Sequence, residues 1–216
     1  MYDSGISAAE LINQLQSEAD IAIEISNAAY VFELNSLEQL LYTEIIREQR
    51  SVSVTPPTNN IIDMSTISSL KGTGENDIRF EDIYTVYAHT PEQSSETLSI
   101  ANQLIKTNLA SSDIFPNTWY NSGGKLGIRT DFTPTKIEII YFVKPALKTV
   151  NASDEVQSGN VSIPYEFIGL VKAKLRGEMY KAVNEDSIAG KWLNDYNVQL
   201  ENFKAWCQSR QAQFGC

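Results

Sequence analysis

The chain has 216 residues, and 17 Lys and Arg against 27 Asp and Glu give a formal net charge of −10. This length suggests one domain, or one domain with a modest second lobe, and a hydrophobic share of 42% excludes wholesale disorder. The longest strongly apolar run, 137–143, is too short to cross a bilayer, so we expect no membrane partner. We also expect no secretory signal, because the first residues lack a basic start and an apolar stretch.

The first fifth of the chain predicts two helices. Ser7 and Glu10 are spaced as a capping box, which predicts a helix over 8–18. A second helix is predicted from about Asn27 to Glu48, and nothing breaks that pattern before Pro56. Its apolar positions recur at spacings of three and four: Tyr30, Leu34, Leu37, Leu41 and Ile45.

The middle of the chain changes to the period of two that is typical of strands. We predict a strand over 78–88 with a bulge near Asp82, and a hairpin over 119–128 that turns at Gly123 and Gly124. Residues 136–143 form the clearest strand, and its two apolar faces indicate a central or covered position. The segment 100–109 fits a helix or a strand equally well.

Helical periodicity returns after a polar segment, 151–160, that we interpret as a mobile loop. One helix is expected to begin at Pro164, and another at Asn184, where the side-chain amide would act as the N-terminal cap. The first of these carries an apolar stripe: Phe167, Val171, Leu175 and Met179.

The order of these elements predicts an α+β fold. N- and C-terminal helices would form a helical bundle, with a β-rich insertion between them. The predicted parts are the N-terminal helices at 1–50, the β-rich insertion at 51–150, and the loop and C-terminal helices at 151–216.

Residues with catalytic or metal-binding chemistry are sparse, so we do not expect an enzyme. His89 is the single histidine, and with Cys207 and Cys216 it cannot show the spacing of a zinc site. The two cysteines are also too few for a disulfide framework and favour a reducing cytosol. Gly72-Thr73-Gly74 completes no phosphate-binding motif, and no cofactor is expected.

The aromatic face of the last helix is typical of a core, and part of it is a candidate subunit interface. The interface candidates are Trp192, Tyr196, Phe203, Trp206, Arg210 and Phe214. Basic residues in the last third form either a solvated face or a patch that docks on an acidic partner. They are Lys172, Lys174, Arg176, Lys181, Lys191, Lys204 and Arg210.

Three groups of segments resemble the head-to-tail connector adaptor proteins of short-tailed bacteriophages, especially those of crAss-like phages. The first group is 27–31 with 37–44, and the second is 115–126 with 139–145. The third group comprises 163–167, 175–178, 184–186 and 191–196.

The resemblance implies a structural virion protein without an active site and a helical bundle with a β-rich extension. Such subunits form a homo-oligomeric ring, typically a dodecamer, beneath the portal protein. The ring extends the DNA channel for genome ejection and receives the next tail ring or tail hub protein. The implied location is the head-tail junction of the virion, with the host cytoplasm during assembly. A net acidic chain suits a lumen that DNA passes without specific binding.

Three other functions remain open from the sequence. One is another ring of the same particle, such as a stopper or head-completion protein. The second is a cytosolic binding module with no link to virions. The third is a glycan hydrolase that would use a carboxylate pair, either Glu33 with Glu38 or Glu178 with Glu185 or Asp186.

Overall fold

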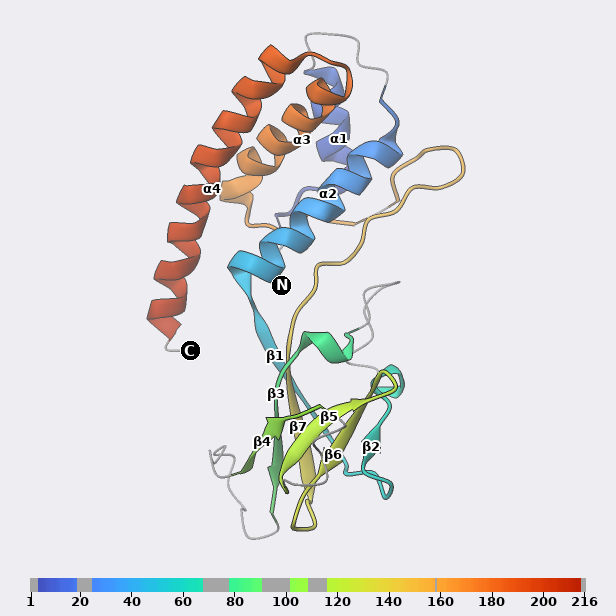
Figure 1. Ribbon diagram of the computed structural model, residues 1–216. Coiled ribbons are helices and arrows are strands. Elements are labelled where there is room, and N and C mark those ends of the chain that lie inside the picture. Colours follow the sequence, from blue (N-terminus) through green and yellow to red (C-terminus); the bar gives the residue numbers. More distant parts are fainter. Residues whose placement is uncertain are drawn as a thin grey trace. The chain divides into compact units, whose positions relative to one another are not determined.

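The computed structural model describes residues 4–18, 25–67, 78–90, 102–108, 116–157 and 159–214, with side chains to Arg210 in the last helix. The fold is α+β, as predicted: N-terminal helices, a curled mixed sheet in the middle of the chain, and C-terminal helices packed together (Figure 1). The chain divides into two compact units. The helical unit comprises Met1–Ile46 and Pro145–Cys216, and the sheet unit is Arg47–Lys144. We had placed the two boundaries at 50 and 150.

The N-terminal helices begin at the caps that their sequences favour. Helix α1 (Ala8–Ser17) starts after Ser7, whose hydroxyl accepts a hydrogen bond from the Glu10 backbone N–H at 3.1 Å. Helix α2 (Asn27–Leu41) starts after Ser26, whose hydroxyl accepts from the Ala29 backbone N–H at 3.3 Å. Both hydroxyls satisfy a backbone donor that the first helical turn leaves unpaired.

The end of α2 differs from the predicted helix. Its last turn widens into a π-helical turn, η1 (Tyr42–Ile46), and Arg47 follows with a φ of 48°. The next residues form strand β1 (Gln49–Val54), which we did not predict. In hindsight the alternation of Ser51, Val52, Ser53 and Val54 has the period of a strand.

The C-terminal helices are α3 (Ile168–Ala182) and α4 (Asp186–Phe214), preceded by the 3₁₀ turn η7 (Tyr165–Phe167). The predicted start at Pro164 is therefore early by this turn. Asn184 is not the N-terminal cap of α4 but the left-handed residue that closes α3, with a φ of 62°. The Glu185 backbone N–H returns to the Tyr180 carbonyl at 2.9 Å, as in a Schellman-type helix end.

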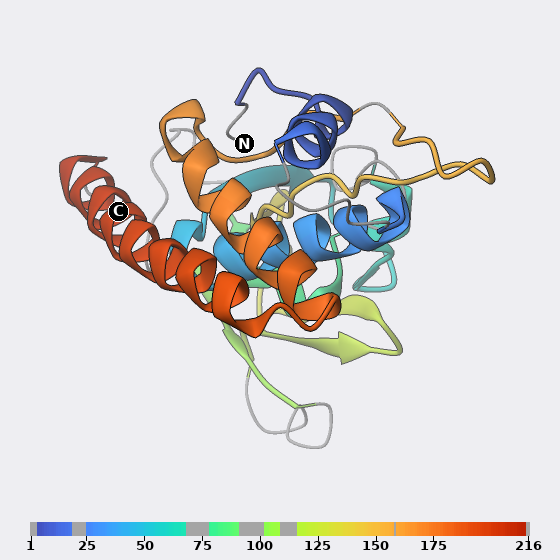
Figure 2. The same cartoon turned by 90° about the horizontal axis from the view of Figure 1, so that it is seen from above.

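Helices α3 and α4 lie side by side in both views (Figures 1 and 2), and α2 packs against α3. Gly177 permits the close approach of α3 and α4, because a Cβ there would lie 2.6 Å from the Leu193 side chain. The apolar stripes predicted for α2 and α3 are largely buried in this unit, among them Tyr30, Leu34, Leu37, Leu41, Val171, Leu175 and Met179.

The sheet unit contains seven strands in the order β1-β7-β3-β4-β5-β6-β2. The strands after β1 are β2 (Ile61–Ile62), β3 (Ile83–His89), β4 (Gln103–Lys106), β5 (Thr118–Ser122), β6 (Lys125–Arg129) and β7 (Lys136–Phe142). All neighbouring pairs are antiparallel except β4 and β5. The core of the unit includes Val86, Leu104, Trp119, Leu126, Ile137 and Ile139.

Most of the predicted strands are confirmed. Strand β7 is flanked by β1 and β3, as its two apolar faces indicated. The β5–β6 hairpin turns at Gly123 and Gly124, whose φ values of 64° and 83° explain the glycines. The strand predicted from Ile78 begins only at Ile83, after the 3₁₀ turn η4 (Phe80–Asp82). The ambiguous segment contains strand β4.

The polar segment 151–160 is anchored to the start of α2. The Asp154 carboxylate accepts hydrogen bonds from the backbone N–H groups of Asn27 at 2.7 Å and Ala28 at 2.9 Å. The Asn27 side-chain amide returns a bond to the Asp154 carbonyl at 2.7 Å. A carboxylate at this place complements the positive end of the helix dipole.

Candidate functional site

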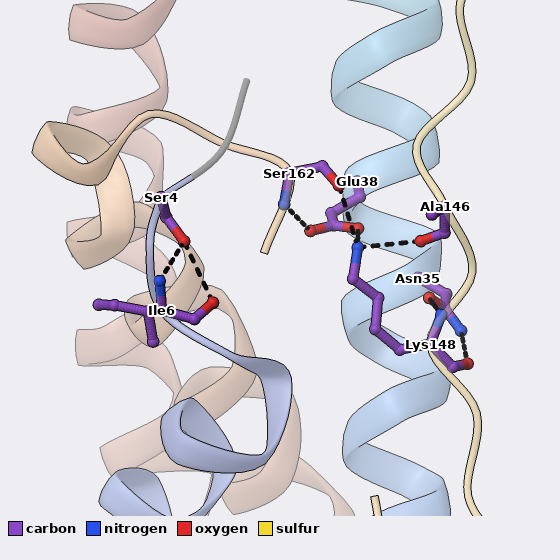
Figure 3. A network of polar contacts seen from close by, with 7 residues as sticks. All are labelled: Ser4, Ile6, Asn35, Glu38, Ala146, Lys148 and Ser162. Atoms are coloured by element: carbon purple, nitrogen blue, oxygen red, sulfur yellow. Dashed lines mark hydrogen bonds and ion pairs between the residues drawn. The ribbon is translucent and has the colours of Figure 1, made fainter. Parts of the chain in front are cut away.

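A buried ion pair holds the segment after β7 against α2 (Figure 3). The side chains of Lys148 and Glu38 are 1% and 0% exposed, and they contact each other directly. The Lys148 ammonium also donates to the Ala146 carbonyl at 3.0 Å and to the Ser162 hydroxyl at 3.2 Å. Each of its three N–H donors therefore has an acceptor, and a buried charge is tolerated only when its hydrogen bonds are made.

The Glu38 carboxylate is held from its other side as well. The Ser162 backbone N–H donates to it at 2.7 Å, and the Asn35 side chain exchanges two hydrogen bonds with the backbone of Lys148. Burial raises the pKa of Glu38, although Lys148 and the Ser162 N–H act in the opposite direction. We infer that the cluster has a structural role, because it holds Ala146, Lys148 and Ser162 against α2.

A surface hollow of about 390 Å³ lies between the first half of α2 and the last half of α3. It is lined by Ile25, Ala29, Phe32, Glu33, Glu178, Met179, Lys181 and Ala182. Glu178 contacts Lys174 one helical turn away, whereas Glu33 has no cation partner within the described ranges. The hollow therefore has apolar walls, the carboxylate of Glu33 on the α2 side and the ammonium of Lys181 on the α3 side.

The exposed side of α2 next to the hollow carries almost no charge. This α2 face consists of Ala28, Phe32, Ser36 and Leu40, all of which are exposed. Phe32 is 67% exposed and Leu40 is 50% exposed. In the described part of the chain, α2 is the one helix that carries two large exposed apolar side chains. A face of this kind usually marks an interaction surface.

The predicted interface candidates on α4 differ in their exposure: two are buried, two are half-buried and Arg210 is exposed. Phe203 is 0% exposed, and it packs against Phe167 and Trp206 at ring-centroid distances of 4.8 and 6.0 Å. Tyr196 is also buried. Trp192 and Trp206 are half-buried, and Phe214 lies beyond the side chains that the structure describes.

Arginines cover the two half-buried tryptophans of α4. The Arg176 guanidinium lies 4.5 Å from the Trp192 ring centroid, and that of Arg210 lies 4.4 Å from the Trp206 ring. These contacts place a guanidinium over each of the two aromatic rings.

The basic residues of the last third are mostly paired within the unit. Lys172 and Arg176 both contact Glu18, Lys174 contacts Glu178, and the Lys204 ammonium lies 2.7 Å from Glu201. Lys181 and Lys191 have no acidic partner in the described residues, and they lie on different helices. The structure therefore gathers no dense basic patch from the described members of this set.

The carboxylates that were paired for a hydrolase lie in different environments in the structure. Glu38 is buried against Lys148, whereas Glu33 lines the hollow on another side of α2. Glu185 and Asp186 are exposed at the start of α4, and Glu178 is paired with Lys174. Glu33 and Glu178 share the hollow, a combination that we had not considered.

The remaining candidate groups are dispersed. His89 Nε2 is buried at the end of β3, 3.3 Å from a carboxylate oxygen of Glu138 on β7. Burial raises the pKa of the Cys207 thiol to about 11, which keeps it protonated at neutral pH. Cys216 and Gly72-Thr73-Gly74 lie outside the described residues. Within the described ranges, no group of three or more His, Cys, Asp or Glu is placed to hold a metal ion.

A membrane span would need a long apolar helix, and none of the described helices qualifies. Comparison of the chain with known protein families and with curated protein sequences finds no match to either.

Sequence reasoning missed three features of the helical unit. The Lys148–Glu38 pair joins positions 110 residues apart, and neither residue stands out from the polar residues around it. The contact of the Asp154 carboxylate with the start of α2 is equally non-local. The α2 face had a signal, because Phe32 and Leu40 fall outside the stripe that contains Leu34, Leu37 and Leu41.

Proposed function

We propose that this chain is a structural subunit of an adaptor ring between the capsid portal and the tail of a short-tailed bacteriophage. The ring extends the DNA channel and receives the next tail component. The observation that carries the proposal is the architecture. A sheet unit is inserted between N-terminal and C-terminal helices that pack together, which is the layout that the resemblance implies.

The three groups of resembling segments support the proposal by their positions. Segments 27–31 and 37–44 lie on α2 and η1, and most of 115–126 forms the β5–β6 hairpin. Segment 139–145 continues β7 into the helical unit, and the third group covers parts of η7, α3 and α4. The resembling segments therefore come from both units.

The distribution of charge is also compatible with a DNA channel. The first 46 residues contain eight acidic residues and no Lys or Arg, so most of the net charge of −10 belongs to this segment. Lys148 compensates Glu38, and Lys172 and Arg176 compensate Glu18. The acids of this segment without a cation partner in the described residues, such as Glu33 and Glu44, repel phosphate.

The test is particle size in solution, measured by mass photometry on the chain alone and on the chain mixed with isolated portal protein. A closed ring, or a monomer that assembles only on the portal, supports the proposal. We expect portal-triggered assembly, because rings that form early would occupy subunits away from the capsid. A monomer at every concentration, with no portal binding, would contradict the proposal.

A truncated chain tests the role of the C-terminal tail separately from the ring proposal. The C-terminal tail is expected to help docking on the portal, so truncation after Gln208 should weaken portal binding. Undiminished binding would exclude the tail from the docking contact and leave the ring proposal in place.

A further inference from the structure

We infer that the α2 face and the adjoining hollow form a docking surface for a basic, amphipathic helix of another protein. The inference does not depend on the ring proposal. Apolar side chains of the incoming segment would cover Phe32 and Leu40, and one would enter the hollow beside them. Lysines or arginines at its edge would pair with Glu33 and Glu44.

The spacing of the exposed residues favours a helix as the partner. Phe32 and Leu40 are eight residues apart on α2, which corresponds to about 12 Å along the helix axis. Two apolar anchors at this separation match apolar positions two turns apart on a second helix. The small side chains of Ala28 and Ser36 on the same side of α2 allow such a helix to approach closely.

The hollow supplies a place for one anchor. Its apolar wall comes from Ile25, Ala29, Met179 and Ala182, and its volume of about 390 Å³ is ample for a leucine or phenylalanine side chain. Phe32 stands at its border and is 67% exposed, so an apolar group placed there would cover both. Burial of such a side chain is the usual source of binding energy at an interface.

The carboxylates on the α2 side favour a basic edge on the partner there, whereas Lys181 on the α3 side of the hollow is a cation without an acidic partner in the described residues. Glu33 and Glu44 lie along α2 and η1 and have no cation partner in the described chain, and the first 46 residues contain no Lys or Arg. Neutral or acidic helices would leave these carboxylates unpaired or repelled, whereas a basic edge pairs with them.

The pairing of the chain's own cations favours another protein, and not a second copy of this chain, as the partner. Most lysines and arginines in the described residues already contact a carboxylate or an aromatic ring of their own unit, as Lys172, Lys174 and Arg176 do. A second copy would therefore present few free cations to Glu33 and Glu44. A different protein would bring its own lysines or arginines to these carboxylates.

The experiment uses the full chain and two labelled peptides in a fluorescence anisotropy titration. One is a 16-residue amphipathic helix of Leu, Ala and Lys, and its twin has Glu in place of every Lys. We expect the basic peptide to bind and the acidic twin not to bind. Phe32→Ser should weaken binding about tenfold, as loss of a central anchor does.

The matched control is Tyr165→Ser, because Tyr165 is 64% exposed and lies on η7, away from the hollow. This variant should bind as the unaltered chain does. Glu33→Gln should weaken binding at low salt and reduce its salt dependence, whereas Glu10→Gln on α1 should do neither.

Three results would overturn the inference. The first is equal binding by both peptides, and the second is equal loss of binding in Phe32→Ser and Tyr165→Ser. The third is self-association of the chain alone that Phe32→Ser abolishes and Tyr165→Ser does not, because the occupant would then be a second copy.

Discussion

At the scale of single residues, the most demanding arrangement is the buried pair of Lys148 and Glu38. Two charges removed from water are tolerated only when their mutual attraction and their hydrogen bonds offset the cost of desolvation. Here the Ser162 N–H and hydroxyl, together with the Ala146 carbonyl, supply those bonds. The pair fixes where the segment after β7 meets α2.

Removal of one partner should therefore be worse than removal of both. We expect Glu38→Gln to lower the free energy of unfolding by about 3–5 kcal/mol, because it leaves the Lys148 ammonium buried without its counter-charge. The double variant Glu38→Leu with Lys148→Met should lie closer to the unaltered protein. Urea denaturation followed by far-ultraviolet circular dichroism measures all three.

Equal losses in the single and double variants would show that packing, and not the unpaired charge, dominates at this position. Lys204→Met serves as a control, because the Lys204–Glu201 pair is exposed and such pairs contribute about 0–1 kcal/mol.

At the scale of elements, local patterns predicted most helices and strands, and non-local contacts decided the rest. The helical period in α2 and α3 and the Gly123-Gly124 turn were sufficient because each depends on neighbours in sequence. The end of α2 was not predictable in this way. Arg47 adopts the left-handed region between η1 and β1, where the chain leaves the helix for the strand that pairs with β7.

The candidate site follows the same division. Tyr196 and Phe203 were correctly recognised as an apolar stripe, but a stripe alone does not distinguish a core from an interface, and both are buried in the helical unit. The hollow could not be foreseen, because its two walls come from α2 and α3, which are far apart in sequence.

The loop before η7 gives a prediction about the start of α2. Asp154→Ala removes two hydrogen bonds from the Asn27 and Ala28 N–H groups and a negative charge from the helix N-terminus. We expect a loss of about 1–2 kcal/mol in the free energy of unfolding, measured by urea denaturation.

Asp154→Asn is the informative companion, because asparagine keeps one acceptor and tolerates the φ of 60° at this position. It should lose about half as much. An Asp154→Ala variant as stable as the unaltered chain would mean that water replaces the carboxylate at no cost.

At the scale of the whole molecule, the sheet unit has the connections of a separate folding unit. Both of its ends lie on paired strands: Gln49 of β1 is opposite Phe142 of β7, and the Val143 N–H donates to the Glu48 carbonyl at 2.9 Å. Its core is made of its own residues, such as Val86, Trp119 and Ile139.

We therefore expect the fragment 47–144 to fold alone, with a dispersed amide spectrum in nuclear magnetic resonance and a cooperative thermal transition. The complementary chain, with 47–144 replaced by a short glycine linker, should keep its helical circular dichroism. A fragment that stays unfolded while the full chain folds would show that the sheet needs the helical unit.

Because the sheet unit is inserted between the helices, it also determines the order in which the parts of the protein can fold during synthesis. Helices α1 and α2 emerge first, but α3, which packs against α2, is synthesised more than 100 residues later. The sheet can close as soon as β7 has emerged, before α3 exists. During that interval the apolar side of α2 stays open, and this nascent stage is the one most exposed to aggregation.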